Sequence, residues 1–113
     1  MTLAALAAAL VVSLSAPGHT PAANAKWFYT VKATVAGKPV RAKLTVQIVD
    51  PFGGVHPVTY ASTKRPLVNW PFKGRFRDYV QFPAESAGLK VTVRITVKAG
   101  AKRRVLSYWV RPR

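Results

Sequence analysis

The 113-residue sequence contains no cysteine, and only three of its residues are acidic. Without cysteine the fold cannot contain a disulfide, and a thiolate metal site is excluded. The stability of the protein must therefore come from its hydrophobic core. Apolar residues make up 50% of the chain, which is enough to form such a core.

The sequence has few groups that could carry out catalysis. Asp50, Asp78 and Glu85 are the only carboxylates, and His56 is the single histidine after residue 25. Hydrolysis needs a positioned carboxylate pair or a nucleophile with a base, and no serine lies in a Gly-x-Ser-x-Gly context. Soft or borderline metals need several Cys, His or Met ligands, more than His56 and Asp50 provide. We therefore predict a protein that is not an enzyme and has no metal or cofactor.

The first 25 residues contain no Lys, Arg, Asp or Glu. Leu3–Leu14 is a run of Ala, Leu and Val interrupted by Ser13, and Ala23–Ala25 reads Ala-Asn-Ala. The run suits the apolar region of a signal peptide and is shorter than the ~20 residues of a membrane-spanning helix. The pattern predicts a signal peptide over 1–25, a domain over 26–113, and a secreted or cell-envelope location. A membrane anchor formed by an uncleaved signal is the alternative.

All 18 Lys and Arg residues lie in the segment 26–113, which gives the chain a formal net charge of +15. A basic excess of this size attracts polyanions in general. We expect the partner to be an anionic envelope polymer or a membrane surface. Nucleic acid is less favoured because export removes the protein from it. The alternative is a structural or protein-interaction domain whose basicity is incidental.

The segment Leu89–Val110 has the clearest periodicity. Apolar residues alternate with Lys, Thr and Arg from Leu89 to Lys98, which is typical of a half-buried strand. A two-residue turn at Gly100-Ala101 would pair positions that sum to 201, so that Val91 faces Val110 and Ile95 faces Leu106. The apolar residues then share one face, and the segment predicts a hairpin.

Two earlier segments alternate in the same way. Lys26–Ala36 and Val40–Ile48 flank a turn at Gly37-Lys38, and a two-residue loop would match Trp27 with Ile48 in a second hairpin. Shorter strands are expected at Pro57–Ser62, Leu67-Val68 and Arg75–Phe82, the last one either kinked at Asp78 or beginning after it. No segment after residue 25 has helical period. About seven short strands predict an all-β, immunoglobulin-like antiparallel β-sandwich, whose predicted core is Val31, Leu44, Val46, Ile48, Val91, Val93, Ile95 and Tyr108.

The order of strands resembles bacterial secreted immunoglobulin-like or fibronectin type III-like domains. At the corner before the sixth strand of such domains an acidic residue and a glycine precede a tyrosine. Glu85 and Gly88 match this pattern, but Leu89 stands at the tyrosine position, and the Cys–Trp–Cys core signature is absent. The stretch from GKPVRAKLTVQIVDPFGG through GRFRDYVQFPAESAGLKVTV also resembles the small envelope domains called YtkA-like. These resemblances imply a fold and not a function.

Two groups of residues are candidates for binding. Between Lys64 and Phe82, aromatic residues interleave with cations, although Trp70, Phe76 and Phe82 are expected to fill the core. On the last hairpin, Trp109 is expected to be exposed among cations, unless a subunit, domain or terminal segment covers it. Arg41 and Lys43 are expected on the opposite sheet from Arg94 and Lys98, so that charge is spread over both faces. The candidate polyanion-binding residues are Lys64, Arg65, Lys73, Arg75, Arg77, Lys90, Arg94, Trp109 and Arg111.

Overall fold

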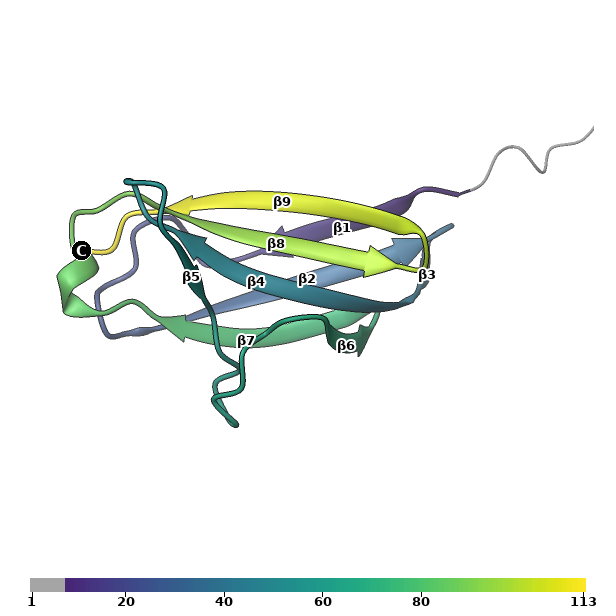
Figure 1. Cartoon of the computed structure of the whole chain (residues 1–113), viewed down its shortest axis with the longest axis horizontal. Coiled ribbons are helices and arrows are strands. Elements are labelled where there is room, and N and C mark those ends of the chain that lie inside the picture. The colour runs from purple at the N-terminus through teal and green to yellow at the C-terminus, as the bar shows by residue number, and fades with distance from the viewer. Residues whose placement is uncertain (1–7) are drawn as a thin grey trace, which may run out of the picture.

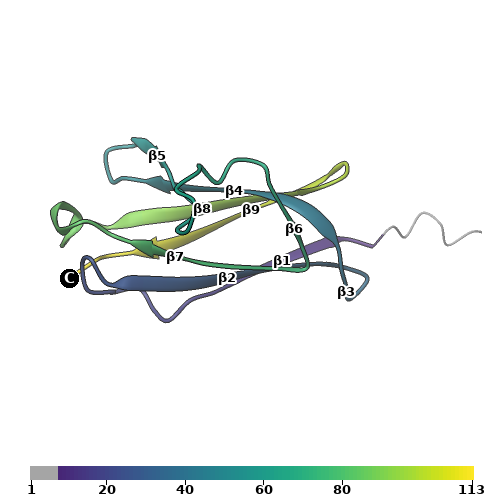
Figure 2. The ribbon, with the colours of Figure 1, turned by 90° about the horizontal axis from the view of Figure 1, so that it is seen from below.

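Two antiparallel β-sheets lie face to face in the computed structural model, which describes residues 8–113 (Figures 1 and 2). The described residues contain no α-helix, only a 3-10 turn at Ala84–Ser86. No helix of this part is long and apolar enough to span a membrane. The all-β prediction is therefore confirmed as two antiparallel sheets.

The first sheet, sheet A, has β2 (Lys26–Val35) at its centre. One edge of β2 pairs with β1 (Leu10–Ser15) and the other with β7 (Arg75–Gln81). The two-residue β3 (Lys38–Pro39) turns back onto the end of β2. Alternate residues of β2 from Trp27 to Ala33 are buried, as its period-two pattern predicts.

The second sheet, sheet B, is built around β4 (Arg41–Val49) and β8 (Val91–Ala99). β9 (Lys102–Val110) pairs with the free edge of β8. The free edge of β4 pairs with β5 (Val55–Pro57) and β6 (Trp70–Lys73).

The hairpin of β8 and β9 has the predicted register. Val91 lies opposite Val110, Val93 opposite Tyr108 and Ile95 opposite Leu106. The turn at Gly100 has a φ of 59°, a left-handed conformation that glycine adopts without a Cβ penalty. The prediction holds here because the turn and the apolar pattern are local to one segment.

The core lies between the inner faces of the two sheets. Six of the eight predicted core residues are buried; Ile48 and Tyr108 are partly buried and pack against the core. Trp27 and Tyr29 of β2, together with Phe76 and Phe82, add an aromatic portion to it. The fully buried set also includes Leu67, from a loop without regular structure, and Leu10.

The predicted hairpin of Lys26–Ala36 with Val40–Ile48 is wrong. β2 and β4 lie in different sheets, because β3 pairs with β2 only at Thr34 and Val35 before the chain crosses over at Val40. Pro39 has no N–H with which to extend the ladder. Period-two patterning tells which face of a strand is buried, and two strands that face each other across the core satisfy it as well as two paired ones.

The short strands between β4 and β8 also differ from the prediction. The strand expected at Pro57–Ser62 is β5 at Val55–Pro57, followed by an isolated bridge between Thr59 and Pro66. The edge strand expected at Leu67-Val68 is β6, three residues later. β7 runs without the break expected at Asp78, whose carboxyl is buried in the sandwich.

The segment 8–25, which the sequence assigns to a signal peptide, is part of the folded sandwich. β1 pairs with β2 over six residues from Leu10–Val35 to Ser15–Thr30, and Leu10 is 2% exposed. The buried indole N–H of Trp27 donates to the carbonyl of Gly18 at 2.9 Å. The described folded unit therefore begins before the predicted boundary at Lys26; residues 3–7 of the apolar run lie outside the described part.

The predicted cleavage sequence is itself held in a turn. Asn24 has a φ of 65°, its N–H donates to the carbonyl of Phe82 at 2.7 Å, and its carbonyl accepts from the side chain of Gln81. Ala23 donates to the carbonyl of Arg113. Cleavage after Ala25 would remove these bonds together with β1, and it stays a prediction that the mass of the natural protein can test.

Leu10→Ala tests whether β1 belongs to the fold. We expect the free energy of unfolding to fall by about 2–5 kcal/mol, because the change leaves a cavity between the sheets. Val11→Ala is the matched control, since Val11 is 59% exposed on the other face of β1. Urea denaturation measures both, and equal, small losses would show that β1 is not docked.

Ile95→Ala and Thr92→Ala test the register of the central strand. Ile95 is fully buried, and we expect a loss of about 2–5 kcal/mol on its truncation. Thr92 lies on the outer face of β8, so its truncation should cost well under that. Denaturation curves compare the two variants, and a Thr92→Ala loss as large as that of Ile95→Ala would place the register wrong by one residue.

Candidate functional site

None of the three carboxylates pairs with a Lys or Arg side chain of the described residues. In the part of the chain that the structure describes, the only contact within 4 Å between an acidic side chain and a His, Lys or Arg side chain joins Asp50 to His56, whose Nε2 lies 2.7 Å from Asp50 Oδ2. No Lys or Arg side chain there is paired with an acidic group. The basic excess therefore remains on the surface, uncompensated by the protein's own carboxylates.

Asp50 organises the turn after β4. Its Oδ1 accepts the N–H groups of Phe52 and Gly54, each at 2.8 Å. The hydrogen bond from His56, followed by these backbone bonds, lowers the pKa of Asp50 below its usual range. Residues 8–113 contain no group of three or more His, Cys, Asp or Glu that could hold a metal ion. Asp50 and His56 therefore stabilise the loop between β4 and β5.

Asp78 is the one buried charged residue in the described core, at 7% exposed. It accepts the N–H of Ala61 at 3.1 Å and so ties the loop after β5 to β7. Burial raises its pKa above the ordinary value. Burial, with a smaller contribution from the Asp78 carboxylate, also raises the pKa of Tyr29, which lies opposite Asp78 in the β2–β7 register. This pair is enclosed in the sandwich, where a macromolecular ligand cannot reach it.

The structure divides the nine candidate residues among three places. Arg75 and Arg77 lie on the outer face of sheet A. Lys64 and Arg65 lie in the loop between β5 and β6. The remaining five, Lys73, Lys90, Arg94, Trp109 and Arg111, are on or beside the outer face of sheet B.

The single residue Gly74 causes the split between Lys73 and Arg75. It joins β6 of sheet B to β7 of sheet A; its N–H donates to Val40 and its carbonyl accepts from Ala33. Its φ is 72°, and a Cβ at this position would lie 2.7 Å from the Cβ of Pro39. A continuous basic-aromatic segment in the sequence thus becomes parts of two opposite surfaces.

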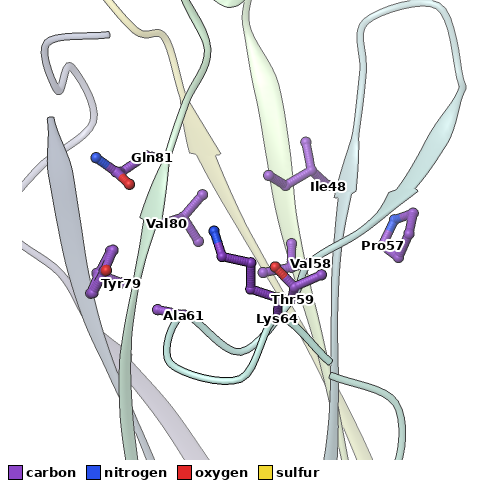
Figure 3. A pocket seen from close by; sticks show the side chains of 9 residues that line it. All are labelled: Ile48, Pro57, Val58, Thr59, Ala61, Lys64, Tyr79, Val80 and Gln81. Carbon is purple, nitrogen blue, oxygen red and sulfur yellow. The ribbon is translucent and has the colours of Figure 1, made fainter. Parts of the chain in front are cut away.

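Lys64 extends beside a cavity of mixed polar and apolar lining at the open edge between the sheets (Figure 3). The cavity has a volume of about 280 Å³, and Ile48, Val58 and Val80 contribute to its lining. Lys64 has a φ of 59°, in a turn closed by hydrogen bonds between Tyr60 and residues 64 and 65. It is therefore separated from the cations of both outer faces.

On the outer face of sheet A, cations lie on aromatic rings. Arg77 Cζ is 4.7 Å from the centroid of Phe28, and Lys26 Nζ is 4.9 Å from that of Tyr79. The two rings are themselves 5.3 Å apart. Such contacts stabilise a cation by about 0.5–1 kcal/mol at exposed sites. The sequence pointed to Arg77 and Tyr79, which lie in the segment Lys64–Phe82, but not to Lys26 and Phe28. These two residues join the group only through the β2–β7 register.

On the outer face of sheet B, cations lie opposite cations. Arg41 of β4 faces Lys73 of β6, while Lys43 faces Lys98 of β8, which faces Arg103 of β9. We call these five residues the sheet B cluster. The expectation that Arg41 and Lys43 point away from Arg94 and Lys98 is therefore wrong: β4 and β8 are neighbours in one sheet. The sequence showed that each residue faces outward, but only the strand order places them side by side.

The other end of the same face carries Trp109. Trp109 is 41% exposed, and Lys90 Nζ lies 5.4 Å from the centroid of its ring. His19, from the segment assigned to the signal peptide, stacks on it at 4.0 Å, and its Nδ1 lies 2.6 Å from the carbonyl of Trp109. A terminal segment therefore covers part of this ring. Arg94 is held by two hydrogen bonds to Gln47 Oε1, at 2.9 and 3.2 Å.

No protein-family model and no curated protein matches this sequence. The fold is similar to a DUF4466 family protein from Parabacteroides merdae ATCC 43184, with a TM-score of 0.50 and 16% sequence identity. The match covers 95% of this chain and 44% of that one, so this chain spans less than half of the neighbour's length. At this identity the likeness concerns the β-rich fold alone.

Gly74→Ala tests the connection that separates the two charged faces. We expect a loss of at least about 1–2 kcal/mol from the left-handed backbone, and more from the contact with Pro39. Gly37→Ala is the control, since its φ is 74° and nothing lies within 4 Å of the added Cβ. Thermal unfolding of both variants separates the clash from the backbone strain. Equal losses would show that Pro39 yields to the new methyl group.

Proposed function

We propose that this chain is a non-enzymatic binding module that associates with an anionic polymer or membrane surface through the Lys and Arg residues of its outer faces. One observation carries the proposal: none of these cations is paired with a carboxylate of the described residues, and several lie directly opposite one another across strands. Like charges in such positions destabilise a sheet. An anionic partner would relieve this repulsion.

The fold assignment that goes with this function is an immunoglobulin-like sandwich. In that class the strands A, B and E form one sheet, and C, F and G lie in the other. Taking β1, β2, β4, β7, β8 and β9 as A, B, C, E, F and G reproduces this division. The extra strands β5 and β6 pair with the C strand. This correspondence supports the resemblance seen in the sequence more strongly than the degenerate corner motif at Glu85–Gly88.

An extracytoplasmic location is a separate part of the proposal and rests on the uncharged segment 1–25. Outside the cytoplasm the module would meet anionic wall polymers and membrane surfaces. Because β1 and the following turn belong to the sandwich, this proposal does not need cleavage after Ala25. The location can be read from cell fractionation, independently of the binding assay.

Salt-dependent binding tests the function. The full chain would be sedimented with long-chain inorganic polyphosphate, with phosphatidylglycerol vesicles and with DNA, between 0.05 and about 0.15 M salt, where the screening length falls to about 8 Å. We expect binding that weakens steeply with salt. Each cation that contacts the polyanion releases counterions and so steepens the fall of the logarithm of the binding constant with the logarithm of the salt concentration. A charge-neutral vesicle of phosphatidylcholine is the control. No binding to any of the three anionic probes at moderate salt would leave the structural-domain alternative.

A further inference from the structure

The sheet B cluster surrounds a depression in the outer face of the molecule. Its volume is about 780 Å³, and four of the five cluster residues line it: Arg41, Lys43, Lys73 and Lys98. The rest of its lining consists of Ala42, Asn69, Pro71, Phe72 and the turn residue Gly100. This groove brings together four cations, whereas the cavity beside Lys64 is lined by one.

The positions of these cations are fixed by strand pairing. Arg41 and Lys73 are direct partners across β4 and β6, and Lys43 and Lys98 are direct partners across β4 and β8. The Cβ atoms of such partners lie about 4.5–5.5 Å apart. All four residues are exposed. Four ammonium or guanidinium groups are thus presented over one small area by strands that cannot separate.

The other cationic surfaces differ in what already contacts their charges. On sheet A, Arg77 and Lys26 rest on Phe28 and Tyr79, and Arg94 on sheet B is hydrogen-bonded to Gln47. No cation–π contact, salt bridge or side-chain hydrogen bond engages the four groove cations within residues 8–113. Their mutual repulsion is therefore offset only by solvent and salt. An anion bound here would relieve more of this repulsion than an anion bound at the other cationic surfaces.

We propose that this groove is the main binding site for the phosphate groups of a linear phosphate polymer. This inference rests on the proposed function and assigns it to one place. Each phosphate within such a chain carries one negative charge, and a terminal one carries up to about two near pH 7, so consecutive phosphates of one polymer can contact several of the four cations at once. A single carboxylate can neutralise only one of them.

Inorganic tripolyphosphate is the probe for the test, titrated calorimetrically into the full chain at several salt concentrations. Lys43→Gln combined with Lys98→Gln removes two partners of the groove. Lys26→Gln combined with Lys32→Gln is the matched control, because both cations are exposed on the outer face of β2 in sheet A, away from the groove, and neither is a candidate binding residue. Each pair of changes lowers the net charge by two, from +15 to +13. We expect the groove variant to bind at least tenfold more weakly with a smaller salt slope, and the control to change less than threefold.

Thermal unfolding at low salt gives a second readout. Tripolyphosphate should raise the Tm of the wild type and of the control variant, but not that of the groove variant. Without the probe the groove variant should melt above the wild type, because a like-charge pair has been removed. If the groove variant instead melted below the wild type, its weaker binding would be attributed to a folding defect, and the proposed repulsion between Lys43 and Lys98 would be contradicted.

The outcomes distinguish the site from the function. Equal losses in the two double variants would overturn the groove as a site and leave diffuse attraction to polyanions, so the proposed function would stand. Absence of tripolyphosphate binding, with retained binding to phosphatidylglycerol vesicles, would overturn the phosphate-polymer assignment in favour of a membrane surface. Absence of binding to every anionic probe would overturn both proposals.

Discussion

Everything in this molecule depends on covering the apolar face of β8. Val91, Val93, Ile95 and Val97 are 0–4% exposed, and they are shielded by sheet A on the opposite side of the core. The chain has no disulfide to assist it, so this burial and that of its neighbours must offset the loss of chain entropy. The central position of β8 between β4 and β9 follows, since a strand with such an apolar face is best placed away from the sheet edges.

The same constraint determines where the charge lies. Once one face of each strand is buried, most Lys and Arg residues on those strands point outward, and strand pairing brings some of them opposite each other. Lys102 and Arg104, near the start of β9, are exceptions, because they lie opposite the buried Ala99 and Val97. Sheet A places two of its cations on aromatic rings, whereas the sheet B cluster has no comparable contacts among the described residues. The core thus forces a cationic surface into a defined pattern, and this pattern is the basis of the proposed binding to a polyanion.

The N-terminal segment shows how one apolar run fits two structures. A stretch of Ala, Leu and Val suits the centre of a signal peptide, and it suits an edge strand equally well. β2 has an edge that needs a partner, and Leu10 fills a place in the core beside it. His19 and Gly18 then bond to Trp109 and Trp27 on opposite sheets. These long-range partners hold Leu10–Ser15 as a strand of sheet A, and the sequence of residues 1–25 alone contains none of them.

The sequence by itself determined the all-β class, the outward or inward direction of most strand residues, and the β8–β9 register. Each of these depends on period-two alternation or on a short turn, which are local properties of the chain. The tertiary structure decided which strands are neighbours: it separated β2 from β4, sent Lys73 and Arg75 to opposite faces through Gly74, and placed Lys43 beside Lys98. Alternation cannot supply this information, because a strand buries the same face whether its partner lies beside it in the sheet or across the core.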